Sequence, residues 1–254
     1  AIQKLINEAA TPIGYLMHNQ SSSSFDGQLN AAFANFKSQG ITDLIIDLRY
    51  NGGGSVRTAI YLGSMITGQF EGQLYVKESW NEKVQNAIPE DRFINNFISN
   101  IRNTDIDGNI ILSESINSLN LNRIHFIVTG SSASASELVI NSLRSYIDVV
   151  LVGDTTIGKQ EGSITLYDSD NLTRTGTNLN PNHTYAMQPI VLEIVNKDNQ
   201  NERDGFTPGI TLPGVQLEED YGNLGVLGEK SDPLLDRMIT YITTGSKGVS
   251  KQPY

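Results

Sequence analysis

The chain contains no cysteine, and histidine and tryptophan are scarce, with three copies and one copy among 254 residues. The absence of cysteine excludes disulfide bonds, thiol nucleophiles and cysteine-ligated metal sites. It leaves the redox compartment open, because a chain without thiols suits reducing and oxidising surroundings alike. A chain of this length buries enough apolar surface to fold without covalent cross-links.

Positive charge is also limited. Lysine and arginine together number 18 against 28 acidic residues, which gives a formal net charge of −10, and no basic run is present. This balance argues against nucleic acid or an anionic membrane surface as a partner. No stretch of about 20 apolar residues occurs, so we do not expect a membrane-spanning helix. Residues 1–16 also lack the pattern of a secretory signal peptide.

The remaining composition is that of a folded domain, with 38% hydrophobic and 18% charged residues, and we treat the whole chain as one domain. Strand patterns at 12–17 and 41–48 are each followed by a helix pattern, at 25–40 and 56–68 respectively. Buried strands that alternate with helices predict an α/β layered fold rather than a β-sandwich.

The second half of the chain continues the alternation of strands and helices and then becomes rich in strands. We expect a strand at 124–130, a helix at 137–147 and a strand at 148–154. From Ser163 onward strand patterns dominate until a final helix at 232–245, which predicts a β-rich C-terminal part.

Residues 69–123 are less regular than the segments on either side. We expect a strand at 72–79, a helix at 89–103 that begins with Pro89, and a hairpin or loop at 107–122. An irregular segment between two β-α units predicts an insertion that acts as a lid or contacts a ligand.

Residues 153–159 nearly match the phosphate-binding loop pattern G-x-x-x-x-G-K-[ST]. Gln160 stands where the pattern needs a hydroxyl for Mg²⁺, and a strand pattern follows where a helix is required. Nucleotide binding is therefore a disfavoured alternative.

The three histidines, His18, His125 and His183, are candidates for a metal site or a catalytic base. None has the paired spacing of a zinc motif, and no G-x-S-x-G nucleophile elbow is present, so we expect no metal site. Each lies in or beside a strand pattern, where packing is the commoner role. A histidine base stays open as an alternative.

A run of small residues precedes the helix pattern of the second half. Ser134 and Glu137 fit the capping box S-x-x-E, which would explain one serine as a helix cap. Capping does not explain why Ala133, Ala135 and Ser136 are also small, whereas a site over which another backbone passes requires this. A hydroxyl at a helix N-terminus also lies beside free N–H groups that suit a developing oxyanion.

With histidine disfavoured, a lysine is the remaining candidate base for a serine nucleophile, provided that burial makes its amine neutral. Lys159 has the most suggestive setting, because it follows an apolar strand and precedes another strand pattern. A solvated lysine on a turn is the plain alternative. The glycines at 52–54, after a neighbouring buried strand, could add an N–H donor for an oxyanion.

Three motifs resemble those of the S41 serine peptidases, the tail-specific or C-terminal processing proteases. Residues 47–54, DLRYNGGG, resemble the family's D-L-R-x-N-x-G-G; residues 132–137, SASASE, match its nucleophile segment; and residues 153–160, GDTTIGKQ, are similar to its G-x-x-x-x-G-K. Their order and spacing also agree. The resemblance extends from residue 13 to residue 242 and implies a crotonase/ClpP-like α/β core of β-β-α units.

The resemblance also implies roles for individual residues. Ser134 would be the nucleophile and Lys159, which follows it by 25 residues, the general base. The backbone N–H groups of Gly53 and Ala135 would form the oxyanion hole. Many family members have Asp eleven residues after the nucleophile and Gln four after the lysine, whereas this chain has Ser145 and Ser163. Either serine could orient the lysine amine by hydrogen bonding.

The function implied is that of a bacterial serine endopeptidase that cleaves protein or peptide substrates near exposed C-termini through an acyl-enzyme, without a cofactor or metal. A peptide-binding relative without catalysis is the alternative. The resemblance further implies an exported protein of the periplasm or cell envelope. Family members often carry an upstream PDZ domain, and no such sequence is visible in this chain. Nothing in the sequence indicates the oligomeric state.

Overall fold

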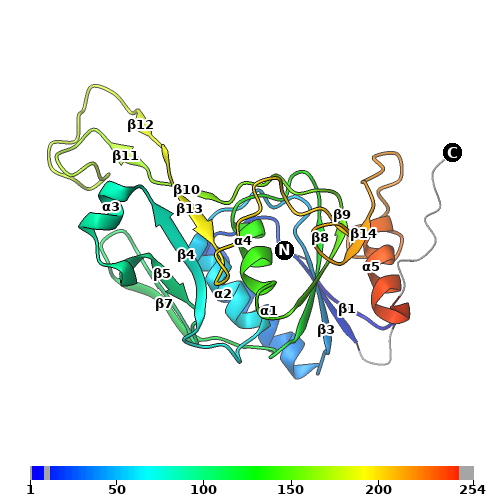
Figure 1. The fold of residues 1–254 in the computed structure, drawn as a ribbon. Coiled ribbons are helices and arrows are strands. Elements are labelled where there is room, and N and C mark those ends of the chain that lie inside the picture. The colour runs from blue at the N-terminus through cyan, green and yellow to red at the C-terminus, as the bar shows by residue number, and fades with distance from the viewer. Residues whose placement is uncertain (1, 9–11, 246–254) are drawn as a thin grey trace.

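The computed structural model of the chain describes residues 2–8 and 12–245. It has a mixed α/β fold with several sheets, and the largest sheet in this part of the chain has six strands (Figure 1). In spatial order these strands are β1 (Ile2–Ile6), β2 (Ile13–Met17), β3 (Asp43–Asp47), β8 (Arg123–Val128), β9 (Asp148–Gly153) and β14 (Gly214–Gln216). β1 pairs antiparallel with β2, and the other neighbours pair in parallel.

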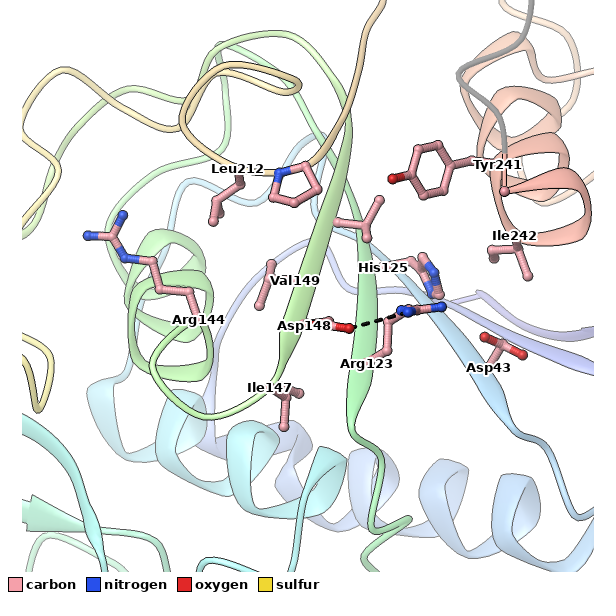
Figure 2. A pocket seen from close by; sticks show the side chains of 13 residues that line it. Asp43, Arg123, His125, Arg144, Ile147, Asp148, Val149, Leu212, Tyr241 and Ile242 are labelled. Carbon is pink, nitrogen blue, oxygen red and sulfur yellow. Dashed lines mark hydrogen bonds and ion pairs between the residues drawn. The ribbon is translucent and has the colours of Figure 1, made fainter.

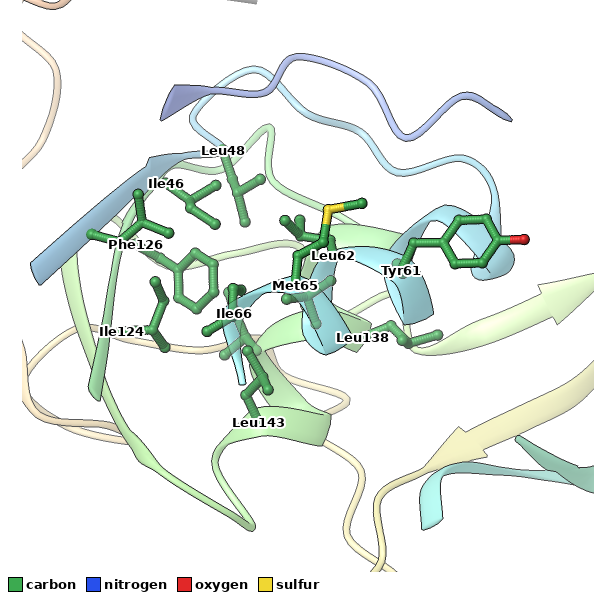
Figure 3. Close-up of a cluster of buried hydrophobic side chains, with 14 of the residues drawn as sticks. Ile46, Leu48, Tyr61, Leu62, Met65, Ile66, Ile124, Phe126, Leu138 and Leu143 are labelled. Carbon is green, nitrogen blue, oxygen red and sulfur yellow. The ribbon is translucent and has the colours of Figure 1, made fainter. Parts of the chain in front are cut away.

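Helices cover both faces of this main sheet. The helices on one face are α1 (Asp26–Ser38), α2 (Val56–Ile66) and α4 (Ala135–Leu143), and the helix on the other face is α5 (Pro233–Thr244). In β3, Leu44 and Ile46 pack with the first three helices, as Figure 3 shows for Ile46, whereas Ile45 packs with α5. Burial on both faces explains why the strands read as continuous apolar runs in the sequence. Among residues 2–8 and 12–245, no helix has the length and hydrophobicity needed to cross a bilayer.

Residues 69–122 lie outside the main sheet, and Arg123 begins β8. They contribute two strands to a second sheet, which has four strands. In spatial order these are β10 (Glu161–Ser163), β13 (Ile190–Val195), β4 (Leu74–Trp80) and β5 (Ile94–Asn96). The segment also contains helix α3 (Glu82–Ala87) and a hairpin of β6 (Asn100–Thr104) and β7 (Ile110–Ser115). The segment is therefore an addition to the main sheet, and its action as a lid stays a prediction.

Two smaller features complete the described chain. The short 3₁₀ helix η1 (Ser23–Phe25) leads into α1. β11 (Leu166–Tyr167) pairs with β12 (Ala186–Met187). Both belong to residues 164–189, called the arm below, which extend at the upper left of Figure 1. The arm joins β10 to β13, so it begins and ends at the second sheet.

The alternation of strands and helices predicted from the sequence is confirmed as far as β9, whereas β1 and β14 were not predicted. The helix predicted at 89–103 is wrong. That stretch contains the 3₁₀ helix η2 (Glu90–Phe93) followed by β5 and β6. Three buried apolar residues in this stretch lie four positions apart, namely Phe93, Phe97 and Ile101. This spacing is typical of one face of a helix, but the three residues belong to separate short segments.

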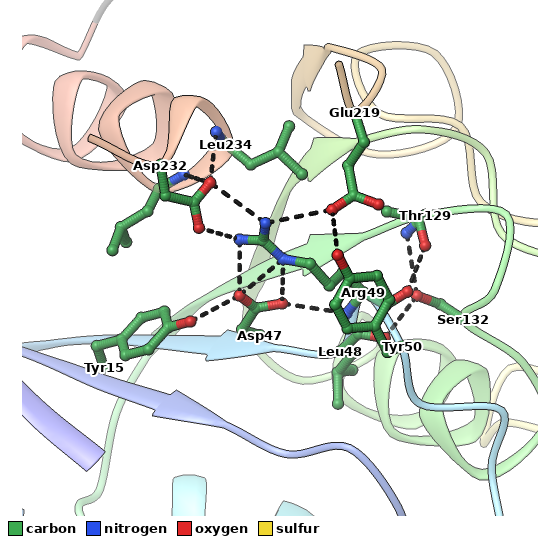
Figure 4. Close-up of polar contacts among 11 residues, drawn as sticks. Tyr15, Asp47, Leu48, Arg49, Tyr50, Thr129, Ser132, Glu219, Asp232 and Leu234 are labelled. Carbon is green, nitrogen blue, oxygen red and sulfur yellow. Dashed lines mark hydrogen bonds and ion pairs between the residues drawn. The ribbon is translucent and has the colours of Figure 1, made fainter. Parts of the chain in front are cut away.

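A buried ionic cluster lies between the end of β3 and α5, on one face of the main sheet (Figure 4). The Arg49 side chain is 1% exposed; its Nη2 lies 2.6 Å from Asp232 Oδ2, and its Nε lies 3.0 Å from both carboxylate oxygens of Asp47. Tyr15 donates its hydroxyl to Asp47 at 2.7 Å, and Glu219 lies 3.4 Å from Nη1 of the arginine. Asp232 also caps α5, so the cluster ties the end of β3 to that helix.

We predict that Arg49→Ala lowers the free energy of unfolding by about 3–5 kcal/mol, because it leaves the buried carboxylates of Asp47 and Asp232 unpaired. The matched control is Arg123→Ala, which removes an exposed ion pair with Asp148 and should cost at most about 1 kcal/mol. Urea unfolding followed by circular dichroism measures both changes. If both variants lost the same free energy of unfolding, the buried cluster would stabilise the fold no more than an exposed ion pair does.

Candidate active site

The two segments predicted to carry the chemistry face each other across one cavity of about 210 Å³. Its lining includes Ser134 and Ala135, at the start of α4, and the continuous stretch 159–163. The structure thereby brings Ser134, Ala135, Lys159 and Ser163 together, as the sequence analysis expected. Below, residues 131–136 are called the Ser134 turn and residues 154–160 the Lys159 loop.

Ser134 has a backbone conformation that few residues other than glycine adopt. It is the N-cap of α4, with φ 56° and ψ −113°, and its side chain is half-buried at the cavity. A positive φ in a residue with a Cβ is strained, and strain of this kind is concentrated at functional sites. Ala135 is the first residue of the helix, so its N–H has no partner within the helix.

The serines on either side of Ser134 have structural roles. Ser132 donates its hydroxyl to the Leu48 carbonyl at 2.8 Å, and Ser136 donates to the Asn51 carbonyl at 2.9 Å. The Ala133 N–H reaches the same Asn51 oxygen at 3.1 Å. The Ser134 turn is thus bonded to the chain that leaves β3, part of which is visible in Figure 4.

Gly53 passes directly over the Ser134 turn, as expected from the small residues there. Its φ is 109°, and a Cβ built on it would lie 2.6 Å from Ser134 Cβ. Its N–H, however, donates to Asn51 Oδ1 at 2.9 Å, while the Asn51 amide donates to the His18 carbonyl at 2.8 Å. In this conformation the Gly53 N–H is therefore bonded to the Asn51 side chain, and its part in an oxyanion hole stays a prediction.

Lys159 lines the cavity, but the chain alone does not meet the condition that its side chain be buried. The side chain is exposed, and within the described residues no hydrogen bond joins its amine to the Ser134 hydroxyl. The physical reason is its position just before β10, which is the edge strand of the second sheet. No further strand of the described chain pairs with the outer edge of β10 to cover the amine.

The two serines considered as partners of the lysine occupy different places. Ser163 lines the cavity and accepts a hydrogen bond from Gln188 Nε2 at 3.2 Å. Ser145 lies beyond the last residue of α4, at the end of the helix opposite to Ser134, and its hydroxyl is buried without a hydrogen-bond partner among the described residues. It does not line the cavity.

Gln188 is a cavity residue that the sequence analysis missed. It lies between β12 and β13, and it reaches the cavity only because the arm returns to the second sheet. No local pattern marks it, since its partner Ser163 is 25 residues away in the chain. Ser163, which stands four residues after Lys159, is thus bonded to a glutamine from a distant part of the chain.

None of the three histidines lines this cavity. His18 is buried near the Asn51 amide, and burial lowers its pKa to about 4. His125 has its pKa lowered to about 4, also mainly by burial, and lines a larger cavity of about 480 Å³ at the N-terminal ends of β3, β8 and β9 (Figure 2). His183 lies on the arm, 3.2 Å from Asp168. In the described residues, no group of three His, Asp or Glu side chains is arranged to hold a metal.

The geometry of the Lys159 loop contradicts the phosphate-binding alternative. A phosphate-binding loop needs backbone N–H groups that are free to hold the anion and a helix that follows. Here the N–H groups of Gly158 and Lys159 donate to the Glu137 carboxylate, and β10 follows instead of a helix. A protein carboxylate therefore takes the place that a phosphate would need.

Comparison with known proteins supports the resemblance found in the motifs. The family model Peptidase family S41 matches residues 12–188. Similar solved structures include a candidate S41 protease from Bacteroides fragilis, with 22% identity and a TM-score of 0.75 over 96% of this chain and 58% of that one. A candidate peptidase from Parabacteroides merdae has 17% identity and a TM-score of 0.57 over 98% of this chain and 67% of that one.

The photosystem II D1 C-terminal processing protease is a further similar structure, with 18% identity and a TM-score of 0.54 over 84% of this chain and 46% of that one. At these identities the structures show a shared fold, and the chain spans about half to two thirds of their length. No curated protein matches the chain. Because the family model covers well over half of the residues, the chain belongs to peptidase family S41.

Proposed function

We propose that the chain is a serine peptidase in which Ser134 is the nucleophile and Lys159 the general base. The observation that carries this proposal is the single cavity onto which both residues open, with Ser134 on a strained turn at a helix N-terminus. We further propose that the main sheet and its helices are a crotonase/ClpP-like core. The substrates would be proteins or peptides cleaved near their C-termini, a preference suggested by the motif resemblance and by the similar D1 C-terminal processing protease.

The proposed reaction follows from the positions of these groups. Lys159 takes the Ser134 proton, and the hydroxyl oxygen attacks the substrate carbonyl to form a tetrahedral intermediate. The N–H of Ala135 and the positive end of α4 stabilise the oxyanion. Gly53 contributes its N–H when the oxyanion replaces Asn51 Oδ1 as acceptor. The lysine then protonates the leaving amine, and water hydrolyses the acyl-enzyme.

Because the Lys159 side chain is exposed, the bound substrate would have to bury its amine. A lysine acts as a base only when its amine is neutral, and removal from water favours the neutral form. A peptide lying in the cavity would cover the amine and supply the burial that the free chain lacks. The same exposure is the observation that favours the second candidate function, a peptide-binding relative without catalysis. A fluorophosphonate probe that leaves Ser134 of the folded chain unlabelled would support that candidate.

We predict that Ser134→Ala and Lys159→Ala each abolish acylation nearly as completely as the double variant. The first removes the attacking atom and the second removes the group that activates it, so the losses should not add. The measurement is the acylation rate with an activated ester, with folding checked by circular dichroism. A Lys159→Ala variant that kept most of the wild-type rate would assign the base to another residue.

The pH dependence separates a lysine base from a histidine base. The deprotonated fraction of a lysine amine grows with rising pH, so kcat/KM should increase from about pH 6 to about pH 9. His18, whose pKa is lowered to about 4, is already neutral above about pH 5 and would give a flat profile over that range. A pH profile with a peptide substrate makes the distinction, and a plateau at acidic pH would contradict the lysine assignment.

We predict that Gly53→Ala reduces acylation by at least about 10²-fold, because its Cβ would collide with Ser134 and displace the hydroxyl. Gly52→Ala is the matched control, since a Cβ at that position meets open space and its φ is not positive. Single-turnover acylation rates compare the two variants. If Gly53→Ala retained the rate of Gly52→Ala, the close approach to Ser134 would have no role in catalysis.

A further inference from the structure

Glu137 is a fully buried carboxylate in the first turn of α4, three residues after Ser134. Its Oε2 accepts hydrogen bonds from the N–H of Ser134 at 3.0 Å and the N–H of Lys159 at 2.8 Å. The backbones of the proposed nucleophile and the proposed base are therefore bonded to the same oxygen atom.

The other oxygen binds only the Lys159 loop. Oε1 of Glu137 accepts from the Gly158 N–H at 2.6 Å and from the Thr156 hydroxyl at 2.5 Å. Thr156 in turn accepts the Phe206 N–H at 2.8 Å, which extends the connection to the segment that precedes β14. Three of the four donors thus come from the Lys159 loop and one from the Ser134 turn.

This arrangement exceeds what a helix cap requires. In a capping box the glutamate accepts one bond from the N-cap residue, and its second oxygen is free for water. Here both oxygens are buried, and all four partners are donors. A carboxylate offers an acceptor oxygen at both positions, whereas a carboxamide presents an NH₂ group at one of the two.

We propose that Glu137 is a positioning residue that fixes the separation between the Ser134 hydroxyl and the Lys159 amine by holding both loops on one carboxylate. The proposal rests on the proposed Ser134–Lys159 chemistry. Glu137 itself does not touch the reacting atoms. One backbone hydrogen bond also joins the loops, from the Ile157 N–H to the Ser132 carbonyl at 3.0 Å, and it remains when the carboxylate is replaced.

The test is Glu137→Gln, which keeps the size of the side chain and removes the charge. The amide NH₂ replaces one of the two oxygens: at the Oε2 position it faces the N–H groups of Ser134 and Lys159, and at the Oε1 position it faces the Gly158 N–H and the Thr156 hydroxyl. In either orientation a donor of the Lys159 loop loses its acceptor, so hydrogen exchange should rise in that loop. A plain cap would affect only the start of α4. With a peptide substrate, kcat should fall by about 10²-fold while KM changes little, since the reacting groups separate but the rest of the cavity is retained.

Glu202→Gln is the matched control. Glu202 is a partly exposed carboxylate that pairs with Arg144 at the other end of α4, and neither of these two residues lines the cavity. It should change kcat less than about 2-fold and leave exchange in the Lys159 loop unaltered. If Glu137→Gln does not fold, Thr156→Val removes one donor to the same carboxylate and is read by the same two measurements.

The outcomes separate the two proposals. Faster exchange in the Lys159 loop together with a selective fall in kcat supports the positioning role. Exchange confined to the helix start, or an unchanged kcat in a folded Glu137→Gln variant, overturns it. A wild-type chain that neither hydrolyses peptides nor reacts with a fluorophosphonate at Ser134 overturns the proposed function, and a rise in exchange in the Lys159 loop would then support only the connection between the two loops.

Discussion

The candidate site depends on the buried charge of Arg49. Burial of a guanidinium is unfavourable unless carboxylates surround it, and Asp47 and Asp232 provide that environment here. Their contacts fix the chain as it leaves β3, and the carbonyl groups of this same stretch accept the hydrogen bonds of the Ser134 turn. The ionic cluster therefore fixes the stretch of backbone to which the turn of the proposed nucleophile is hydrogen-bonded.

Ser134 and Lys159 are positioned by different sheets. Ser134 begins a helix that packs on the main sheet, whereas Lys159 lies where the chain crosses from β9 of that sheet to β10 of the second sheet. A relative movement of the two sheets would change the distance between the hydroxyl and the amine. A carboxylate that binds both loops opposes such a movement, at the point where the chain passes between the sheets.

The sequence predicted those parts of the site that depend on local patterns. The capping box placed Ser134 at a helix start, and the small residues around it predicted the close passage of Gly53. Features that depend on which distant segments meet were not predictable. Gln188 enters the cavity from the end of the arm, and the partner of the Gly53 N–H is a side chain whose direction no pattern records. The exposure of Lys159 follows from an edge position that only the strand order reveals.

The positive φ of Ser134 has a consequence for the sequences that this fold can tolerate. A glycine at that position would adopt the same dihedral angles without strain and so relax the backbone, but it would carry no hydroxyl. Selection for thermodynamic stability and selection for a reactive oxygen therefore oppose each other at a single residue. A descendant of this chain that lost its catalytic task would gain stability by exchanging that serine for glycine.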